Sequence, residues 1–369
     1  MKKNASEPAA NEYNWKIMRK AAMTSRERWE AVLRHQKPDR TPMDYWATPE
    51  FSSKLMVHLE CETEEEALRK LNVDFVVKAE PLYCGPPLLA GTDVFGSRFR
   101  DIDYGSGEYR ECITHPLAEF ETVDEIESGY TWPDPDWWDY SVLPNQLRGH
   151  KDHPVIGGSY EPFLIYKQLR GEEQSYLDLV LNPDLVHYCL DKLLHLDLEE
   201  ITRIYETIPG QVLLTYVAED MGGQEDLLFS PEHIRAFLLP HIRRVINLVH
   251  SSGVYVFHHN DGAIRRILPD MVEAGIDLLN PIQWRCQGLD RRELKKTFGD
   301  QIVFHGAMDN QETLPFGTVT DVEREVRENL DILGKDGGYI LAPCHNIQPL
   351  TPVENVVAMY RTCFIESLL

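Results

Sequence analysis

The sequence alternates short apolar runs, most of them ending in polar residues, with longer segments of helical periodicity. The short runs are rich in residues that favour β-strands, and the longer segments repeat apolar residues at three- and four-residue spacing. Such runs occur at residues 41–46, 73–78, 154–160, 211–220, 254–261, 276–283, 302–309 and 339–345. Eight strands separated by helices are typical of a (β/α)8 TIM barrel, and we predict this fold, in the α/β class.

The helical segments carry start signals. Residues 230–253 open with Ser230 as a candidate N-cap, followed by a proline at the first helical position, and they close near a glycine. Thr351 and Glu354 form a capping-box signature for a last helix. A first helix is expected to begin at Thr24 or Ser25.

One section breaks the alternation. From about residue 90 to residue 150 the chain is aromatic and rich in turn-forming residues, as in "VFGSRFRDIDYGSGEYRECITHPL" and "WPDPDWWDYS". We predict a β-hairpin and extended insertion after the second strand, which could serve as a lid, with a separate small domain as the alternative. Residues 1–22 are polar and are expected to form an N-terminal tail, which leaves residues 23–369 as a single barrel domain.

Composition narrows the function classes. The chain is 43% apolar, which is ample for a large core, and its net charge of −23 argues against a nucleic-acid-binding surface. No apolar run reaches the roughly 18 to 20 residues of a membrane helix, and the N-terminus lacks a signal-peptide core. The seven cysteines are scattered without a C-x-x-C pair, which disfavours a disulfide framework or a zinc ribbon. A cytoplasmic protein without a membrane partner is therefore expected.

Polar residues at the ends of the predicted strands mark the candidate site. In TIM barrels the active site lies at the carboxyl ends of the strands. Most of the predicted strands end in residues that can bind a ligand or titrate. They are Asp44, Trp46, Lys78, Glu80, Ser159, Tyr160, Glu161, Glu219, Asp220, His258, His259, Asp261, Asn280, Gln283, His305, Asp309, Cys344, His345 and Asn346.

The stretch "YVFHHNDGAI" holds the clearest pair of candidate metal ligands. His259 and Asp261 are two residues apart, so on an extended chain they point to the same face, while His258 points away. Imidazole nitrogen and carboxylate oxygen suit Zn²⁺ and related ions. A hydrogen-bonded polar pair is the alternative. Cys344 and His345 end the eighth predicted strand at the same mouth and are candidates for a further ligand, or else packing residues.

Other strand-end residues have two interpretations each. Asp220 could be a general acid or base, as could Asp261, but Asp220 could equally cap the turn that follows it. Asp309 could orient a ligand, although a cap of the following turn is the preferred interpretation. The predicted substrate-binding residues, some of which could instead be core aromatics, are Trp46, Glu80, Tyr160, Gln283 and Asp309.

Several segments, in their order along residues 25 to 369, resemble the uroporphyrinogen decarboxylase superfamily. They are "RERWEAVLRHQKPDRTP", "SPEHIRAFLLPHIRRVI", "HNDG", "GIDLLNPIQ", "FHGAMDNQETLPFGT" and "YILAPCHNIQPLTPVEN". The resemblance is to the branch of cobamide-dependent methyltransferases that includes the coenzyme M methyltransferases. It implies a (β/α)8 barrel, in agreement with the strand count. It also implies that a homodimer is possible.

The resemblance has departures that bear on the activity. In the decarboxylases an arginine-rich stretch follows the "PDR-P" segment and binds substrate carboxylates, whereas here "MDYWATPEF" has no arginine. The methyltransferase branch binds zinc through a His-x-Cys pair and the cysteine of an "A-P-G-C" segment. Here the pair is His259-x-Asp261, and "APCHNI" puts His345 at the cysteine position and Cys344 one residue earlier. The resemblance thus implies His259, Asp261 and His345 as ligands, with Cys344 as the alternative third ligand.

The function expected from this resemblance is zinc-dependent methyl transfer. The chain would work with cobalamin or another corrinoid on a partner protein, and would move a methyl group to or from a small substrate. That substrate is a thiol acceptor, or an O- or N-methyl donor as in demethylase systems. The alternatives are a decarboxylase or lyase that uses Asp220 or Asp261 without a metal, and a non-catalytic binding barrel.

Overall fold

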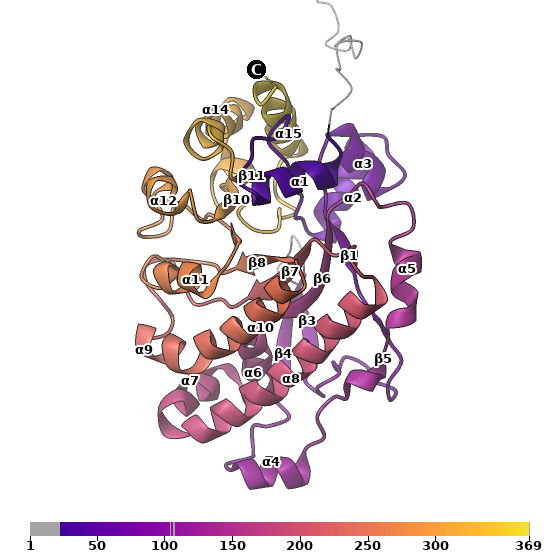
Figure 1. Cartoon of the computed structure of the whole chain (residues 1–369), viewed down its shortest axis with the longest axis vertical. Helices are drawn as coiled ribbons and strands as arrows, with labels where there is room; N and C mark the ends of the chain where they lie inside the picture. The colour runs from indigo at the N-terminus through magenta and orange to yellow at the C-terminus, as the bar shows by residue number, and fades with distance from the viewer. Residues whose placement is uncertain (1–22, 104, 106–107, 369) are drawn as a thin grey trace, which may run out of the picture.

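The computed structural model describes residues 23–103, 105 and 108–368. Seven strands form one curled sheet in the order β1-β6-β7-β8-β9-β10-β11, and every neighbouring pair is parallel (Figure 1). The predicted tail, residues 1–22, lies outside the described residues. The strand bounds are β1 Val77–Ala79, β6 Val155–Tyr160, β7 Leu214–Ala218, β8 Tyr255–His259, β9 Leu278–Asn280, β10 Val303–Met308 and β11 Tyr339–Pro343.

The first predicted strand is present as isolated bridges and not as a named strand. Met43 bridges to Leu341 in β11, and Ala47 bridges to Ile347, both in parallel. On its other side the carbonyl of Met43 accepts a hydrogen bond of 2.7 Å from the amide of Asp74, three residues before β1. Residues 41–47 therefore pair with β11 and with Ile347 beyond it in one direction, and with the segment that leads into β1 in the other. A proline at position 42 leaves one amide hydrogen fewer for a regular ladder.

Helices follow most of the strands. Residues 231–251 form the helix predicted for this segment, in three successive parts, and the hydroxyl of the N-cap Ser230 accepts a hydrogen bond from the amide of His233. The predicted capping box at Thr351 is wrong, because the last helix has Pro352 at its N-cap and no side-chain cap. The helices are α1 Ser25–Leu33, α2 Pro49–His58, α3 Glu64–Lys70, α4 Val123–Gly129, η2 Pro135–Trp137, η3 Tyr140–Val142, α5 Leu143–Gln146, α6 Pro162–Arg170, α7 Glu172–Leu181, α8 Pro183–Thr207, α9 Pro231–His233, η4 Ile234–Leu238, α10 Leu239–Ser251, α11 Leu268–Ala274, α12 Arg291–Phe298, α13 Thr313–Phe316, α14 Val319–Asn329, η5 Leu330–Gly334 and α15 Val353–Glu366.

Short elements outside the main sheet separate β1 from β6. Strands β3, Arg98–Asp103, and β4, Glu108–Thr114, pair antiparallel. Strands β2, Leu82–Tyr83, and β5, Trp138–Asp139, form a second antiparallel pair. These elements fall in and beside the section where the sequence breaks its alternation.

The interior of the curled sheet is apolar at the amino ends of the strands. Trp29 and Val32 of α1 are fully buried there against residues from the beginnings of several strands. The indole Nε1 of Trp29 donates a hydrogen bond of 3.0 Å to the carbonyl of Asp74. Helix α1 therefore covers the amino ends of the strands and leaves the carboxyl ends as the place for a site.

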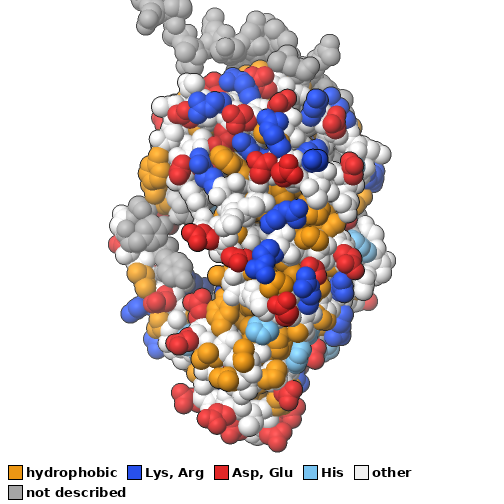
Figure 2. Space-filling model, turned by 90° about the vertical axis from the view of Figure 1, so that its left-hand side faces the viewer, with side chains coloured by type: hydrophobic (Ala, Val, Ile, Leu, Met, Phe, Trp, Pro, Cys, Tyr) orange, Lys and Arg blue, Asp and Glu red, His pale blue; other side chains and the backbone are white. Residues whose placement is uncertain are grey.

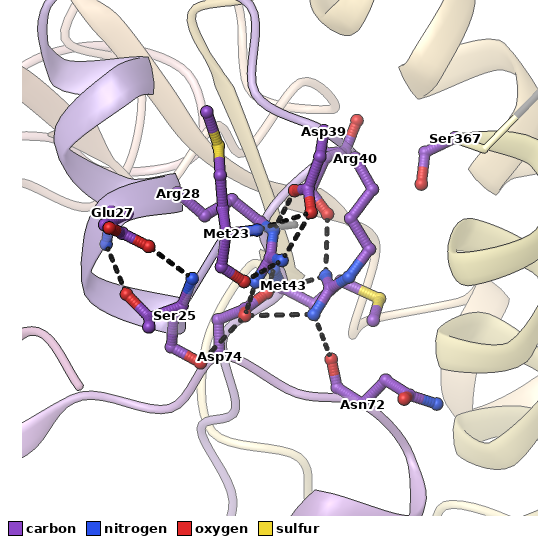
Figure 3. A network of polar contacts seen from close by, with 12 residues as sticks. Met23, Ser25, Glu27, Arg28, Asp39, Arg40, Met43, Asn72, Asp74 and Ser367 are labelled. Carbon is purple, nitrogen blue, oxygen red and sulfur yellow. Dashed lines mark hydrogen bonds and ion pairs between the residues drawn. The ribbon is translucent and has the colours of Figure 1, made fainter. Parts of the chain in front are cut away.

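A buried ion-pair network holds α1 against the sheet (Figure 3). Asp74 is fully buried and accepts hydrogen bonds from Arg28 at 2.5 Å and from Arg40 at 2.7 and 2.9 Å. Its carboxylate also accepts bonds from the amide of Met43 and the hydroxyl of Ser25. One carboxylate thus joins α1, the segment 41–47 and the approach to β1.

The outer surface mixes charges of both signs. On the face shown in Figure 2, Lys and Arg side chains lie among Asp and Glu side chains, and hydrophobic side chains gather in its lower half. Among the described residues, no helix combines the length and apolar character that a membrane span requires.

Candidate metal centre

Three residues at the carboxyl ends of β7 and β8 lie close enough to share one ion. His259 is the last residue of β8, Asp261 follows two residues later, and Asp220 follows β7. The ligand atoms of the three all lie within 4.8 Å of one another. The Nε2 atom of His259 lies 3.6 Å from Oδ1 of Asp220 and 3.9 Å from Oδ1 of Asp261. These separations fit atoms that each stand about 2.0 to 2.2 Å from a common zinc ion.

The backbone and a neighbouring amide hold the two carboxylates in place. The amide of Asp261 donates a hydrogen bond of 3.0 Å to Oδ1 of Asp220. Nε2 of Gln283 donates a bond of 3.0 Å to Oδ1 of Asp261, and Oε1 of Gln283 accepts one of 2.7 Å from the amide of Gly262. Gln283 is therefore an orienting residue for Asp261.

A chain of hydrogen bonds fixes the tautomer of His259. Its Nδ1 lies 2.6 Å from Oδ1 of Asn280, and Nδ2 of Asn280 lies 2.7 Å from Nδ1 of His305. Nε2 of His305 lies 3.1 Å from Oδ2 of Asp44, the same oxygen that accepts the indole hydrogen of Trp46 at 3.0 Å. All but Trp46 are buried.

The direction of this chain follows from its Asp44 end. The Asp44 carboxylate can only accept, so Nε2 of His305 donates to it, and Nδ1 of His305 accepts from the amide nitrogen of Asn280, which lies against it. Oδ1 of Asn280 is then left to accept from the Nδ1 hydrogen of His259. Nε2 of His259 therefore presents its lone pair to Asp220 and Asp261, as a metal ligand must.

Two aromatic rings pack against the imidazole of His259. Trp46 stacks on His259 with ring centroids 5.8 Å apart and an interplanar angle of 21°. Tyr216 of β7 lies on it at 5.7 Å. His258 faces elsewhere, as expected, because its Nδ1 contacts the carbonyl of Val217 at 2.7 Å.

Carboxylates crowd this end of the sheet. Burial raises the pKa of Asp261, and the neighbouring Asp220 adds to the shift. Burial and then Asp220 raise the pKa of Glu161 to about 7. Burial, followed by the charge of Glu161, raises the pKa of Glu219 well above its ordinary value. A cation beside Asp220 and Asp261 would relieve this repulsion, so the electrostatics fit a metal ion.

A polar cavity of about 390 Å³ opens onto the two candidate carboxylates. His345 lies at its wall with Nε2 3.9 Å from Oδ2 of Asp261, and its side chain is 43% exposed. The cavity is lined by Lys167, Asp220, Gly222, Gln224, Leu228, Asp261, Gly262, Gln283, Asn310, Gln311 and His345.

Two predicted residues have other contacts. The Cys344 thiol is buried and donates a hydrogen bond of 3.2 Å to the carbonyl of Ile282, and burial raises its pKa well above the usual value. Cys344 is therefore held as a thiol, and among the described residues it is not part of the group that could hold a metal ion. Asp309 accepts bonds from the amides of residues 311 to 313 and from Arg285, so it caps the turn, the preferred interpretation.

Two other predicted residues lie apart from the cavity walls. Glu80 is exposed, and its backbone bonds to Gln146 on α5. Tyr160 is buried at the end of β6 and packs in the core. Neither is among the residues that line the cavity.

Some residues of the site had no predicted role. Asp44, Asn280 and His305 ended predicted strands, and this position was the one signal that could have identified them. Nothing in the local sequence indicated the cavity residues Lys167, Gln224, Asn310 and Gln311.

The fold and the site define an α/β protein with a curled parallel sheet and a polar, metal-capable mouth at the carboxyl ends of its strands. The family model described as Uroporphyrinogen decarboxylase (URO-D) matches residues 143–364. The chain therefore belongs to the uroporphyrinogen decarboxylase family, as the sequence motifs predicted.

Relatives within the family differ in their named activities. The chain is 26% identical over 209 residues to the methylcobamide:CoM methyltransferase MtaA of Methanosarcina barkeri, covering 56% of this chain and 57% of the relative. It is also 26% identical over 220 residues to a uroporphyrinogen decarboxylase of Thermus thermophilus, covering 55% of this chain and 57% of the relative. The matches thus span little more than half the length of either relative.

A solved structure supports the fold. A methyltransferase from Methanosarcina mazei superimposes with a TM-score of 0.68 at 20% identity, over 93% of this chain and 99% of that one. At this identity the likeness establishes the fold, an α/β sheet of the TIM-barrel type, and no more.

Proposed function

We propose that this chain is a zinc-dependent methyltransferase that works with a corrinoid protein. The observation that carries the proposal is the convergence of Asp220, His259 and Asp261, with the lone pair of the histidine directed at the two carboxylates. Similarity to a methylcobamide:CoM methyltransferase supports methyl transfer as the reaction. The methyl group would move to or from a small substrate, a thiol acceptor or an O- or N-methyl donor.

The ligand set we propose differs from the one that the resemblance implied. His259 and Asp261 are kept, Asp220 is the third ligand, and His345 stands near enough to Asp261 to join or to contact substrate. When bound, a divalent ion would supply Lewis-acid chemistry, polarising a methyl ether or amine or favouring a thiolate.

The surrounding residues have distinct tasks in this proposal. Gln283 orients Asp261, and Asn280 holds His259 in the ligating tautomer. Glu161, whose pKa is raised to about 7, can hold or release a proton near neutral pH beside Asp220. In this proposal the protein residues orient the metal ligands and exchange a proton, and no side chain of the protein acts as a nucleophile.

The proposal is tested by methyl transfer to free cobalamin. Zinc-loaded protein mixed with cob(I)alamin and a set of methyl ethers, methylamines and methyl thioethers is expected to form methylcobalamin, recorded from its absorption spectrum. A chelator should stop the reaction and added zinc should restore it. Release of carbon dioxide from a carboxylated substrate, without any corrinoid, would instead favour the decarboxylase alternative that the Thermus thermophilus relative represents.

Asn280 offers a test of the tautomer. Asn280→Leu removes the acceptor for the Nδ1 hydrogen of His259, and we expect zinc affinity to fall roughly 10- to 100-fold. Asn280→Asp keeps an acceptor at the same place, so its zinc affinity should stay near that of the parent. Chelator competition measures both zinc affinities. Thr215→Val is the control, because it removes buried hydrogen bonds of β7 that do not belong to the series from Asp44 to His259. Equal affinities in Asn280→Leu and the parent would refute the orienting role.

A further inference from the structure

The cavity beside the candidate metal group contains one lysine whose charge has no direct partner. Lys167 extends from the last turn of α6 and lines the cavity together with Asp220, Asp261 and His345. Among the residues that the structure describes, its ammonium group has neither an ion pair nor a hydrogen bond. Its charge acts at longer range on Glu161 and Glu219, where it opposes the rise in their pKa.

The neighbouring cation of the same helix shows what a structural role looks like. Arg170 is buried, forms an ion pair with Asp178 at 2.8 Å, and donates to the carbonyl groups of Leu117 and Phe120. All three nitrogen atoms of its guanidinium donate hydrogen bonds. Lys167, three residues earlier, is half-buried and lines the cavity, and its ammonium has no such partners among the described residues.

Once a divalent ion is bound, the charges that line the cavity no longer balance the positive charge of Lys167. The two carboxylates of the candidate metal group balance the charge of a divalent ion. Among the described residues, the lining of the cavity has no acidic side chain apart from these two, and Lys167 belongs to that lining. The loaded cavity therefore has an excess of positive charge, although the whole chain has a net charge of −23.

The remaining wall is suited to a small polar molecule. Amide side chains of Gln224, Asn310 and Gln311 line the cavity and can donate hydrogen bonds to an oxyanion. The volume of about 390 Å³ is within the range of small-molecule sites.

We propose that the substrate of this site carries a carboxylate, which the ammonium of Lys167 binds while the methyl-bearing atom faces His259 and its two carboxylates. The inference rests on the proposed function, because the metal ion supplies the charge that makes an anion favourable. Lys167 is then a specificity-determining residue that separates methylated acids from neutral methyl ethers.

Calorimetric titration of the intact chain tests this with matched acids and amides. The probes are methoxyacetate, 3-methoxypropanoate and 4-methoxybutanoate, each paired with its amide, which has nearly the same shape and no charge. Zinc-loaded protein should bind at least one acid roughly tenfold more tightly than its amide, as a charge-assisted hydrogen bond requires. Equal binding of acids and amides, or binding of no acid at all, would overturn the proposal.

Variants assign the preference to Lys167. Lys167→Met should abolish the acid preference without changing the zinc content, and Lys167→Arg should retain most of it. Lys296→Met removes one charge from an exposed position on α12 and should leave the preference unchanged. An acid preference that survives in Lys167→Met would contradict the assignment.

Zinc measured on the same samples separates the two proposals. A parent chain that binds no zinc, yet shows an acid preference that depends on Lys167, contradicts the proposed function and supports a carboxylate site at Lys167 that does not need the charge of the metal. A zinc-loaded parent that does not distinguish acids from amides contradicts the anion site and leaves the metal centre standing.

Discussion

Replacing His259 by alanine is expected to lower zinc affinity by more than about 100-fold, so that the purified variant retains no stoichiometric metal. The imidazole supplies the one nitrogen ligand of the group, it is buried, and its Nε2 lies 3.6 and 3.9 Å from the two carboxylates. Without it Asp220 and Asp261 remain as two crowded carboxylates, which suit a hard ion with oxygen ligands better than zinc. Metal content by elemental analysis, together with chelator competition, measures the effect.

Three comparisons make this result specific. His58→Ala removes an exposed histidine at the end of α2 and should leave one zinc ion bound per chain. His345→Ala should reduce zinc affinity less than His259→Ala, because His345 contacts the group through Asp261 alone. Cys344→Ser should retain zinc, since the thiol bonds to a carbonyl elsewhere. Stoichiometric zinc in His259→Ala, or its loss in Cys344→Ser, would contradict the ligand set.

The sequence predicted the strands of the sheet well, because each is an apolar run bounded by turn-forming residues. Seven of the eight predicted runs each overlap one strand of the seven-stranded sheet. The first run differs, since residues 41–47 pair through isolated bridges only. Its contacts are with residues far along the chain, Leu341 and Ile347, so the local sequence pattern could not predict these contacts.

The third ligand could be identified only from the order of the strands in the sheet, which the sequence does not give. Alternation along β8 is enough to place His259 and Asp261 on one face. Which distant residue joins them depends on strand order, and β7 lies directly beside β8, whereas β9 and β10 separate β8 from β11. Asp220, at the end of β7, therefore reaches the group, and His345, after β11, lies at its margin. The role of Asn280 was equally invisible, because it depends on His305 and Asp44 in two other parts of the chain.

Replacing Asp74 by alanine is expected to destabilise the fold by about 3 to 5 kcal/mol, the typical cost of leaving buried charges without their partner. The carboxylate is fully buried, and Arg28 and Arg40, both nearly buried, donate to it (Figure 3). Its loss would leave the buried Arg40 without a carboxylate among the described residues, and Arg28 with Asp39 alone. Unfolding in urea, followed by circular dichroism, measures the change in the free energy of unfolding.

Graded variants separate the charge from the hydrogen bonds at this position. Asp74→Asn keeps the size and part of the bonding, so it should cost less than Asp74→Ala. The double variant Arg40→Met with Asp74→Leu should recover part of the loss, because it removes the guanidinium whose one ion pair among the described residues is with Asp74, while Arg28 keeps its ion pair with Asp39. Asp136→Ala breaks an exposed pair with Arg203 and should change stability little. A small loss in Asp74→Ala, comparable to that in Asp136→Ala, would show that α1 is held by the packing of Trp29 and not by this network. Because the network lies at the amino ends of the strands, opposite the metal-capable mouth, folded Asp74→Asn protein should still bind zinc as the parent does.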